Sequence, residues 1–311
     1  MANPRLAFAE NAPGEFYVDR RCIDCDNCRS LAPEVFVQRP PTVEDDGYAY
    51  VVRQPASAAE RCQAIAAVAV CPVQCIGSRV GVPRAEAAES FPMLLEEPVY
   101  FLGQTSHKSF GGKSYVALLP FANVLFDAPR WDRHLRAWLE EHGGVSCIFL
   151  SHRDDVADAP RYADHFGAHV FIGAADADAY RGPRRHALRT STPIGFGDLL
   201  ANQRIAGLAS HPELNRLQLL PTPGHTAGHY CFCLDERFLF AGDHLAVSRL
   251  TGRPYAFRRH CWYDWQRLLA SVRLLQDYPF EWLLPAHGRY GRFPWPELRP
   301  MLATVAVHGA A

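Results

Sequence analysis

The sequence predicts two domains of mixed α and β structure: a small cysteine-rich domain, followed by a larger domain in which helices cover layered sheets. Six of the ten cysteines fall within residues 22–75. From Val99 onward, three short β-rich runs are followed by alternating strand-like and helix-like segments. Hairpins followed by βα alternation are typical of a mixed sheet covered by helices. The 311 residues are enough for two domains, each with its own core.

Composition and charge limit the classes of protein. The net charge is -1, which gives no electrostatic reason to expect a nucleic-acid or membrane partner. Residues 1–17 lack the apolar stretch of a signal peptide, and no run approaches the roughly 18–20 apolar residues of a membrane span. We therefore expect a soluble, cytoplasmic protein. In that reducing compartment, clustered cysteines favour a local metal site over a disulfide scaffold.

The predicted domains cover residues 1–82 and 98–311, joined by a connector over 83–97 that Pro83 and Pro92 delimit. In the second domain, helical spacing of Trp131, Leu135 and Trp138 predicts a helix over 131–142. Two further helices are expected over 162–166 and 262–275. Strands are expected near residues 99–102, 114–119, 123–126, 147–150, 169–172, 217–220, 230–233, 238–241 and 282–284.

The cysteines of the first domain have the spacing of an iron–sulfur site. Cys22, Cys25 and Cys28 form a C-x₂-C-x₂-C run, and Cys71-Pro72 follows well downstream. A cubane cluster needs four converging thiolates, which three cysteines on one loop and a remote fourth supply. The alternative is a zinc knuckle, which favours two separate C-x₂-C pairs. Because the run occurs once, we expect one [4Fe–4S] cluster.

Further residues extend this pattern. Leu31–Phe36 follows the third cysteine, Asp45–Ala49 has the composition of a hairpin, and an alanine-rich helix leads into Cys71. With these features the segment resembles single-cluster bacterial ferredoxins over nearly all of its length. The resemblance implies four cluster ligands: Cys22, Cys25, Cys28 and Cys71.

Two cysteines of this domain remain, Cys62 and Cys75. Some single-cluster ferredoxins carry an additional disulfide, so the two could be paired. Packed free thiols are the alternative that a reducing compartment favours. Cys75 could also compete with Cys71 as the fourth ligand, although Pro72 favours Cys71.

Three motifs with metal-binding side chains follow predicted strands of the second domain. They are Thr222-Pro-Gly-His-Thr-Ala-Gly-His229, Ala241-Gly-Asp-His244 and Pro285-Ala-His-Gly288. Imidazole and carboxylate groups on loops at one rim of a sheet can converge on a metal. Each of these side chains could instead cap a helix or pack in the core.

These motifs, in this order and together with Asn123–Asp127, make residues 98–290 similar to the metallo-β-lactamase superfamily. The resemblance implies an αββα sandwich. It also implies His225 as a ligand of a first metal, Asp243 as a bridging carboxylate and His287 as a ligand of a second metal. His229 and His244 are expected to be structural.

The segment after Leu150 departs from the family. The family motif H-x-H-x-D-H is replaced by Ser151-His-Arg-Asp-Asp-Val-Ala-Asp158, so that His152 fits the first position and Asp154 the second. Val156 and Ala157 stand where the family has an Asp-His pair, which leaves a second metal at most two ligands. Alternatively, this Asp-rich segment could be a helix N-terminus that Asp155 or Asp158 caps, and either role fits Asp154.

We therefore expect one mononuclear ion of iron, zinc or manganese, since carboxylate ligands favour harder metals. Its expected ligands are His152, Asp154, His225 and Asp243, with His287 as the remnant of the second site. In another interpretation the domain has lost its metal.

Three functions remain open. The first, which we favour because it is the superfamily's commonest chemistry, is a metal-dependent hydrolase of a small-molecule substrate, with Asp155 or Asp158 as general base. The second is an oxidoreductase in which the cluster exchanges electrons with a mononuclear iron and a redox partner protein. The third is a metal-free scaffold for electron transfer or interaction. Trp262 and Trp265 are expected in the core, whereas Tyr255 and His260 are candidates for a pocket.

Overall fold

A computed structural model describes residues 2–42, 47–82, 84–120, 122–203, 205, 208 and 212–308. The chain divides into two compact units. Unit 1 comprises Met1–Ser146 and Ala157–Tyr162, and unit 2 comprises Cys147–Val156 and Ala163–Ala311. Unit 1 therefore contains the cysteine-rich segment and the beginning of the predicted second domain. Pro83 and the pair Asp45 and Asp46 of the expected hairpin lie outside the described residues.

The cysteine-rich part of unit 1 is built from two small sheets and two helices. Its elements are β1 (Phe16–Val18), α1 (Asn27–Leu31), β2 (Phe36–Arg39), β3 (Tyr48–Val51), α2 (Ala58–Val70) and β4 (Ile76–Ser78). β1 pairs antiparallel with β4, and β2 pairs antiparallel with β3. Ser57 begins α2 by accepting a hydrogen bond from the Glu60 backbone N–H. The buried face of α2 packs on Phe16 and Phe36, which gives this part its own core.

The rest of unit 1 is an antiparallel meander of β5 (Met93–Glu96), β6 (Val99–Phe101), β7 (Tyr115–Ala117) and β8 (Val124–Phe126). The expected connector therefore contains helix α3 (Arg84–Glu89) and strand β5. Helix α4 (Arg133–Glu141) begins at Asp132, whose carboxylate accepts hydrogen bonds from the backbone of His134 and Leu135. The predicted helix over 131–142 is confirmed.

Unit 2 has two groups of strands. β9 (Cys147–Leu150), β10 (His169–Gly173) and β11 (Arg185–Leu188) are parallel. A six-stranded sheet has the order β12 (Ile194–Gly195), β13 (Leu217–Pro221), β14 (Tyr230–Leu234), β15 (Phe238–Gly242), β18 (Trp282–Pro285) and β19 (Gly291–Arg292). A separate hairpin pairs β16 (Ala246–Val247) with β17 (Pro254–Tyr255). The helices are α6 (Phe196–Gln203), α7 (Trp265–Leu275) and α8 (Trp295–His308), and α5 (Ala159–Phe166) spans the boundary between the units.

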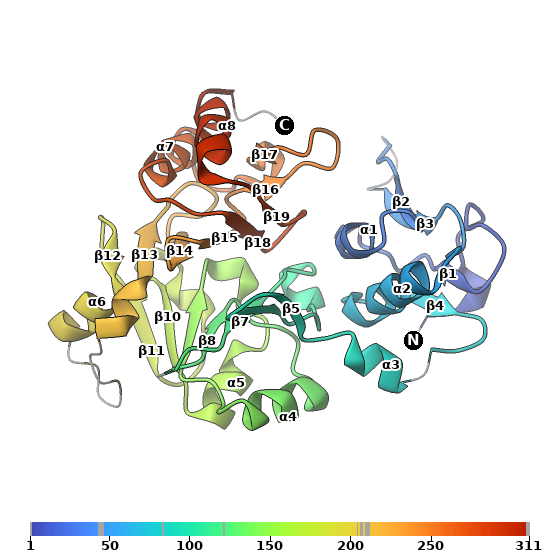
Figure 1. Cartoon of the computed structure of the whole chain (residues 1–311), viewed down its shortest axis with the longest axis horizontal. Helices are drawn as coiled ribbons and strands as arrows, with labels where there is room; N and C mark the ends of the chain where they lie inside the picture. Colours follow the sequence, from blue (N-terminus) through green and yellow to red (C-terminus); the bar gives the residue numbers. More distant parts are fainter. Residues whose placement is uncertain are drawn as a thin grey trace. The chain divides into compact units, whose positions relative to one another are not determined.

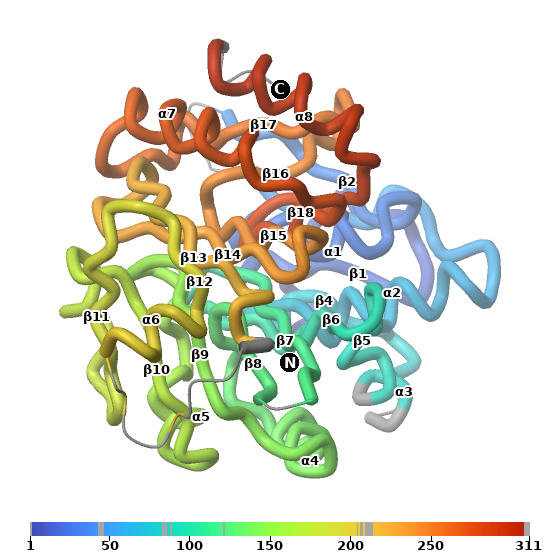
Figure 2. The backbone as a smooth tube through the Cα atoms, turned by 60° about the vertical axis from the view of Figure 1, so that its left-hand side comes forward, coloured from blue at the N-terminus to red at the C-terminus, as the bar shows by residue number. Residues whose placement is uncertain are grey.

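Apolar side chains join these elements in layers. The ring of Phe149 on β9 lies 5.2 Å from that of Phe232 on β14, so the interior faces of the two groups of strands meet. Helices α7 and α8 cover the opposite face of the six-stranded sheet (Figures 1 and 2), where Val272 and Leu302 are buried in the same cluster as Leu283. This confirms the predicted sandwich of helices and mixed sheets.

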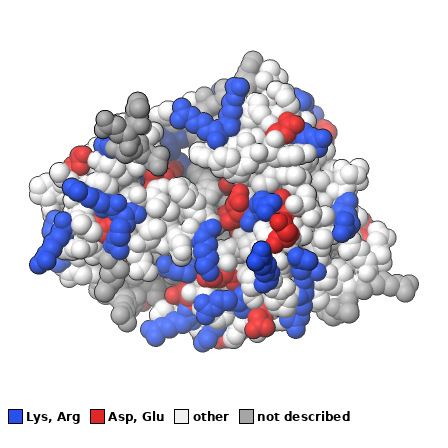
Figure 3. Space-filling view, turned by 180° about the vertical axis from the view of Figure 1, so that it is seen from behind, with Lys and Arg blue, Asp and Glu red and all other residues white. Residues whose placement is uncertain are grey.

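The surface matches the near-neutral composition. On the face shown in Figure 3, Lys and Arg side chains are interspersed with Asp and Glu and form no patch of one sign. No helix among the described residues is long and apolar enough to cross a membrane.

Candidate metal centre

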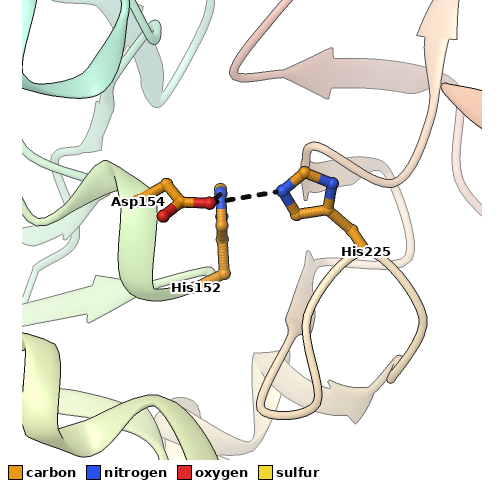
Figure 4. Close-up of side chains that lie close together, drawn as sticks. All are labelled: His152, Asp154 and His225. Carbon is orange, nitrogen blue, oxygen red and sulfur yellow. Dashed lines mark ion pairs between the residues drawn. The ribbon is translucent and has the colours of Figure 1, made fainter. Parts of the chain in front are cut away.

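Three donors from two separate segments meet beside the end of β9. His152 directly follows the strand, Asp154 lies in the 3₁₀ turn Arg153–Asp155, and His225 lies in the loop between β13 and β14 (Figure 4). Their ligand atoms all lie within 4.8 Å of one another. The Asp154 Oδ2 atom is 3.7 Å from Nε2 of both His152 and His225.

A second group of three donors adjoins the first. Asp155, Asp243 and His287 also have ligand atoms within 4.8 Å of one another. Asp243 follows β15 and His287 follows β18, so each donor comes from the end of a strand. The Asp243 Oδ2 atom lies 3.8 Å, 3.6 Å and 3.8 Å from Nε2 of His152, His225 and His287, so this carboxylate faces both groups.

These spacings fit a bound cation. Ligand atoms about 2.1 Å from a tetrahedral ion are separated by roughly 3.4 Å, close to the distances of 3.6–3.8 Å around Asp154 and Asp243. His152 Nε2, both ring nitrogens of His225 and Asp243 Oδ1 are buried and have no hydrogen-bond partner among the described residues. Buried polar atoms are rarely left without a partner, and a cation bound between these atoms would satisfy them.

A second candidate site lies in the cysteine-rich part of unit 1. Its cavity is lined by thirteen residues, among them Cys22, Cys25, Cys28, Cys71 and Cys75. Backbone N–H groups of Asp24 and Ala49 donate to Cys22 Sγ, each at 3.4 Å. The Asn27 side chain donates to Cys25 Sγ at 3.5 Å. A cubane cluster needs converging cysteine thiolates, and hydrogen bonds to sulfur stabilise the thiolate form. The cysteines of this cavity therefore suit such a cluster.

Residues 125–287 match the family described as the metallo-beta-lactamase superfamily. The chain belongs to the metallo-beta-lactamase superfamily. Residues 18–78 match the 4Fe-4S single cluster domain of ferredoxin I, so the protein is a fusion of a ferredoxin domain and a metallo-beta-lactamase domain. The fold and the fusion predicted from the motifs are thereby confirmed.

Named relatives are similar over part of the chain. A hydroxyacylglutathione hydrolase of Rhizobium johnstonii is 30% identical over 148 residues, covering 46% of this chain and 50% of that protein. One from Ectopseudomonas mendocina is 28% identical over 151 residues, covering 42% and 52%. The chain spans about half the length of the curated relatives it matches.

Solved structures are also similar. A metallo-beta-lactamase superfamily protein of Sulfolobus tokodaii is 15% identical, with a TM-score of 0.45, and the match covers 68% of this chain and 86% of that one. A metallo-beta-lactamase from Pseudomonas aeruginosa in its mono-zinc form is 15% identical, with a TM-score of 0.49, covering 70% and 94%.

The metallo-beta-lactamase domain holds His152 in one orientation. Ser151 Oγ lies 2.9 Å from His152 Nδ1, and the Ser151 carbonyl accepts a hydrogen bond from the Tyr230 N–H at 2.8 Å. A partner on Nδ1 leaves Nε2 directed at Asp154 and Asp243, which is how residues behind a metal ligand usually fix its ring.

The loop that carries His225 is fixed by close backbone packing. A Cβ atom on Gly224 would lie 2.3 Å from Leu268 Cα, so only glycine lets α7 approach the loop this closely. The backbone N–H groups of Trp262 and Tyr263 donate to the His225 carbonyl at 3.0 Å and 3.1 Å. These contacts explain why the motif needs a glycine directly before its histidine.

Protonation states in the site suit metal binding. Burial lowers the pKa of His152 to about 4, so its ring is neutral at pH 7. The imidazole of His225, 3.7 Å away, lowers the pKa of Asp154. Burial raises the pKa of Asp243, but the neighbouring His287, His152 and His225 outweigh burial and lower it overall. Neutral imidazoles beside ionised carboxylates are the forms that ligate metals.

The structure brings together all five residues expected to ligate the second-domain metal, and it adds Asp155. The sequence comparison aligned Val156 and Ala157 with the family's second-site ligands and left that site two donors. Asp155, considered only as a base, supplies a third. Its position depends on the 3₁₀ turn, in which the two adjacent aspartates contribute to different groups. In the sequence, the only indication of this role for Asp155 is that two aspartates stand next to each other.

Asp158, the other candidate base, belongs to neither group. Its Oδ1 accepts a hydrogen bond from Lys108 Nζ at 2.6 Å and its Oδ2 accepts one from the Trp131 N–H at 2.8 Å. The hydrogen bond with Lys108 lowers its pKa against the opposing effect of burial. Both oxygens therefore stabilise the local fold of unit 1.

His229 and His244 are buried and belong to neither group, as expected for structural residues. His229 Nδ1 lies 2.9 Å from Thr222 Oγ1, across the mouth of the loop that carries His225. Burial lowers the pKa of His229 far below its usual value and lowers that of His244 to about 3.

The expectation that Trp262 lies in the core is wrong. Helix α7 begins only at Trp265, which packs against the core, whereas Trp262 precedes the helix and is 64% exposed. The Trp262 ring centroid lies 6.2 Å from that of His225 and 5.9 Å from that of His260. An exposed indole beside a candidate ligand is available to contact a substrate.

Proposed function

We propose that the metallo-beta-lactamase domain is a metal-dependent hydrolase with two adjoining metal sites. His152, Asp154 and His225 would hold one ion, Asp155 and His287 a second, and Asp243 would contribute to both. The observation that carries this proposal is the position of Asp243 Oδ2, within 3.8 Å of three imidazole nitrogens that serve the two groups. A divalent ion held there would polarise a substrate carbonyl and make water acidic enough to ionise near neutral pH.

The protein's own groups prepare the site for this chemistry. Ser151 holds the His152 ring, and the Trp262 and Tyr263 N–H groups hold the His225 backbone. The ionised carboxylate of Asp243 would stabilise a cation strongly, because the group is buried and solvent screens the attraction poorly there. Asp154, whose side chain is 50% exposed, lies on the solvent side of the group.

The relatives support hydrolysis of an acyl compound. They are named as hydrolases of hydroxyacylglutathione. The aligned region is confined to about half of each relative, so we extend only the reaction class: hydrolysis of an ester or thioester of a small molecule.

A second candidate function is an oxidoreductase. His152, His225 and one carboxylate form the two-histidine-one-carboxylate set of non-heme Fe(II) centres. The same chain carries a ferredoxin domain, for which we propose Cys22, Cys25, Cys28 and Cys71 as ligands of one [4Fe–4S] cluster. In this case the cluster would exchange electrons with the iron and with a redox partner protein.

Metal and sulfide analysis of protein purified without oxygen separates these functions. About four irons and four labile sulfides, with one or two zinc or manganese ions, are expected for the hydrolase. Five or six irons with four sulfides and no other metal would favour the oxidoreductase. Four irons alone would refute both and leave a metal-free scaffold.

Variants assign the ions to residues. Asp155→Asn should lose the second ion and retain the first, whereas Asp243→Asn should lose both. Asp178→Asn is the matched control, since Asp178 is exposed, pairs with Arg153 and belongs to neither group of donors. Hydrolysis of a thioester, an ester and an amide of one acyl group, measured on the same preparations, tests the reaction. Equal loss of metal in all three variants would contradict the assignment.

A further inference from the structure

Five cysteines, one more than a cubane cluster uses, line the cavity of the ferredoxin domain. Cys71 and Cys75 are both buried, and their Sγ atoms are 3.5 Å apart. This separation is far longer than a disulfide bond of about 2.05 Å, so both thiols are reduced and in contact. The cavity therefore offers two sulfurs at the corner where one ligand is needed.

The backbone fixes Cys75 in this place. Helix α2 ends at Val70, directly before Cys71, and the turn that follows returns the chain so that the Cys75 N–H donates to Cys71 Sγ at 3.4 Å. The Cys75 carbonyl accepts a hydrogen bond from the Asp19 N–H at 2.8 Å. Strand β4 begins at the next residue, Ile76, and pairs with β1. Cys75 is thus held on both sides, with its side chain directed into the cavity.

We propose that Cys75 is a reserve ligand of the cluster, which lies in contact with the Cys71 sulfur at rest and replaces Cys71 when that sulfur is lost. In the exchange, the iron–sulfur bond to Cys71 breaks and one to Cys75 forms. The Cys75 proton passes to the departing Cys71 thiolate, so charge balances and no oxidant is needed. This inference rests on the proposed cluster ligands.

The test compares single and double variants, each reconstituted with iron and sulfide without oxygen. Cys71→Ala should retain about four irons and four sulfides per ferredoxin domain, with a shifted electron paramagnetic resonance spectrum after reduction. Cys71→Ala combined with Cys75→Ala should retain none. Cys28→Ala is the matched control: Cys28 is a buried expected ligand outside the Cys71–Cys75 contact, so this variant should lose the cluster.

A second pair of variants guards against misfolding of the alanine protein. Cys71→Ser preserves the size of the side chain, and its cluster should be lost when Cys75→Ala is added. An unchanged cluster in that double variant would mean that serine ligates, which would overturn the proposal. The proposal would also be overturned if the Cys71→Ala protein contained as little iron and labile sulfide as the Cys28→Ala protein. Absence of labile sulfide from the wild-type protein would instead refute the proposed cluster itself.

Discussion

Acid should destabilise the metal-free metallo-beta-lactamase domain through its buried histidines. The pKa of His152 is about 4 and that of His244 is about 3 in the folded protein, because burial disfavours the charged ring. In the unfolded chain each would have its ordinary value of about 6.5. The unfolded chain therefore binds more protons, and stability is fully present above pH 6.5 and falls as the pH drops toward 4 and 3.

The size of the effect follows from these pKa values. Between pH 7.5 and pH 5, each of the two histidines should lower the free energy of unfolding by about 2 kcal/mol, or about 4 kcal/mol together. His229, whose pKa is also strongly lowered by burial, acts in the same direction. With a urea dependence of about 2 kcal/mol per molar, 4 kcal/mol lowers the unfolding midpoint by about 2 M.

Tryptophan fluorescence is the appropriate measurement, because all six tryptophans lie at residue 131 or beyond and none lies in the ferredoxin domain. His244→Phe should reduce the difference in unfolding free energy between pH 7.5 and pH 5 by about 2 kcal/mol. His134→Gln, at an exposed position of α4, should leave that difference unchanged. A His244→Phe protein with the full wild-type pH dependence would refute the reasoning, whatever its stability at pH 7.5.

Two further predictions concern the two sites. A Cβ atom on Gly111 would lie 2.8 Å from Cys25 Cβ, so Gly111→Ala should lower cluster occupancy, measured as labile sulfide. Gly81→Ala is its control, since Gly81 has a similar positive φ but open space, and equal losses in both variants would contradict the steric cause. Trp262→Ala should raise KM several-fold with little change in kcat for whichever ester or thioester is hydrolysed, because the exposed indole would contact substrate rather than metal. A fall in kcat at unchanged KM would rule out that role.

Sequence patterns predicted the features that depend on short stretches of chain. The C-x₂-C-x₂-C run and the histidine after Pro223-Gly224 carry their meaning in local spacing, and each was confirmed at the level of the domain. Two-residue strands such as Ala246–Val247 are too short to show a period of two and were not predicted. Helix α8 was also missed, since Pro300 lies inside it and interrupts the expected pattern.

Asp155 and Trp262 could not be placed from the sequence because their roles depend on backbone direction. A 3₁₀ turn replaces the regular spacing of the family motif, and it brings Asp155 to the second group although the aligned ligand positions are apolar. Two tryptophans three residues apart suggest one helical face, but Asp264 caps the helix, which begins only at Trp265. In both cases a shift of one or two residues in an element boundary changes which side chain reaches the site.

The carboxylates of the site bear on which metal it would take. Asp155 and Asp243 offer oxygens no more than 4.8 Å apart. Two unit charges at that distance repel by about 3 kcal/mol at an effective dielectric constant of about 20, so the pair is unfavourable without a cation between its members. Three carboxylates among six donors also make the site harder than one built from histidines, which favours iron or manganese over zinc. The same chain has a ferredoxin domain, so a bound iron at this site would favour redox chemistry. The identity of the bound metal is therefore the property that distinguishes the two proposed functions.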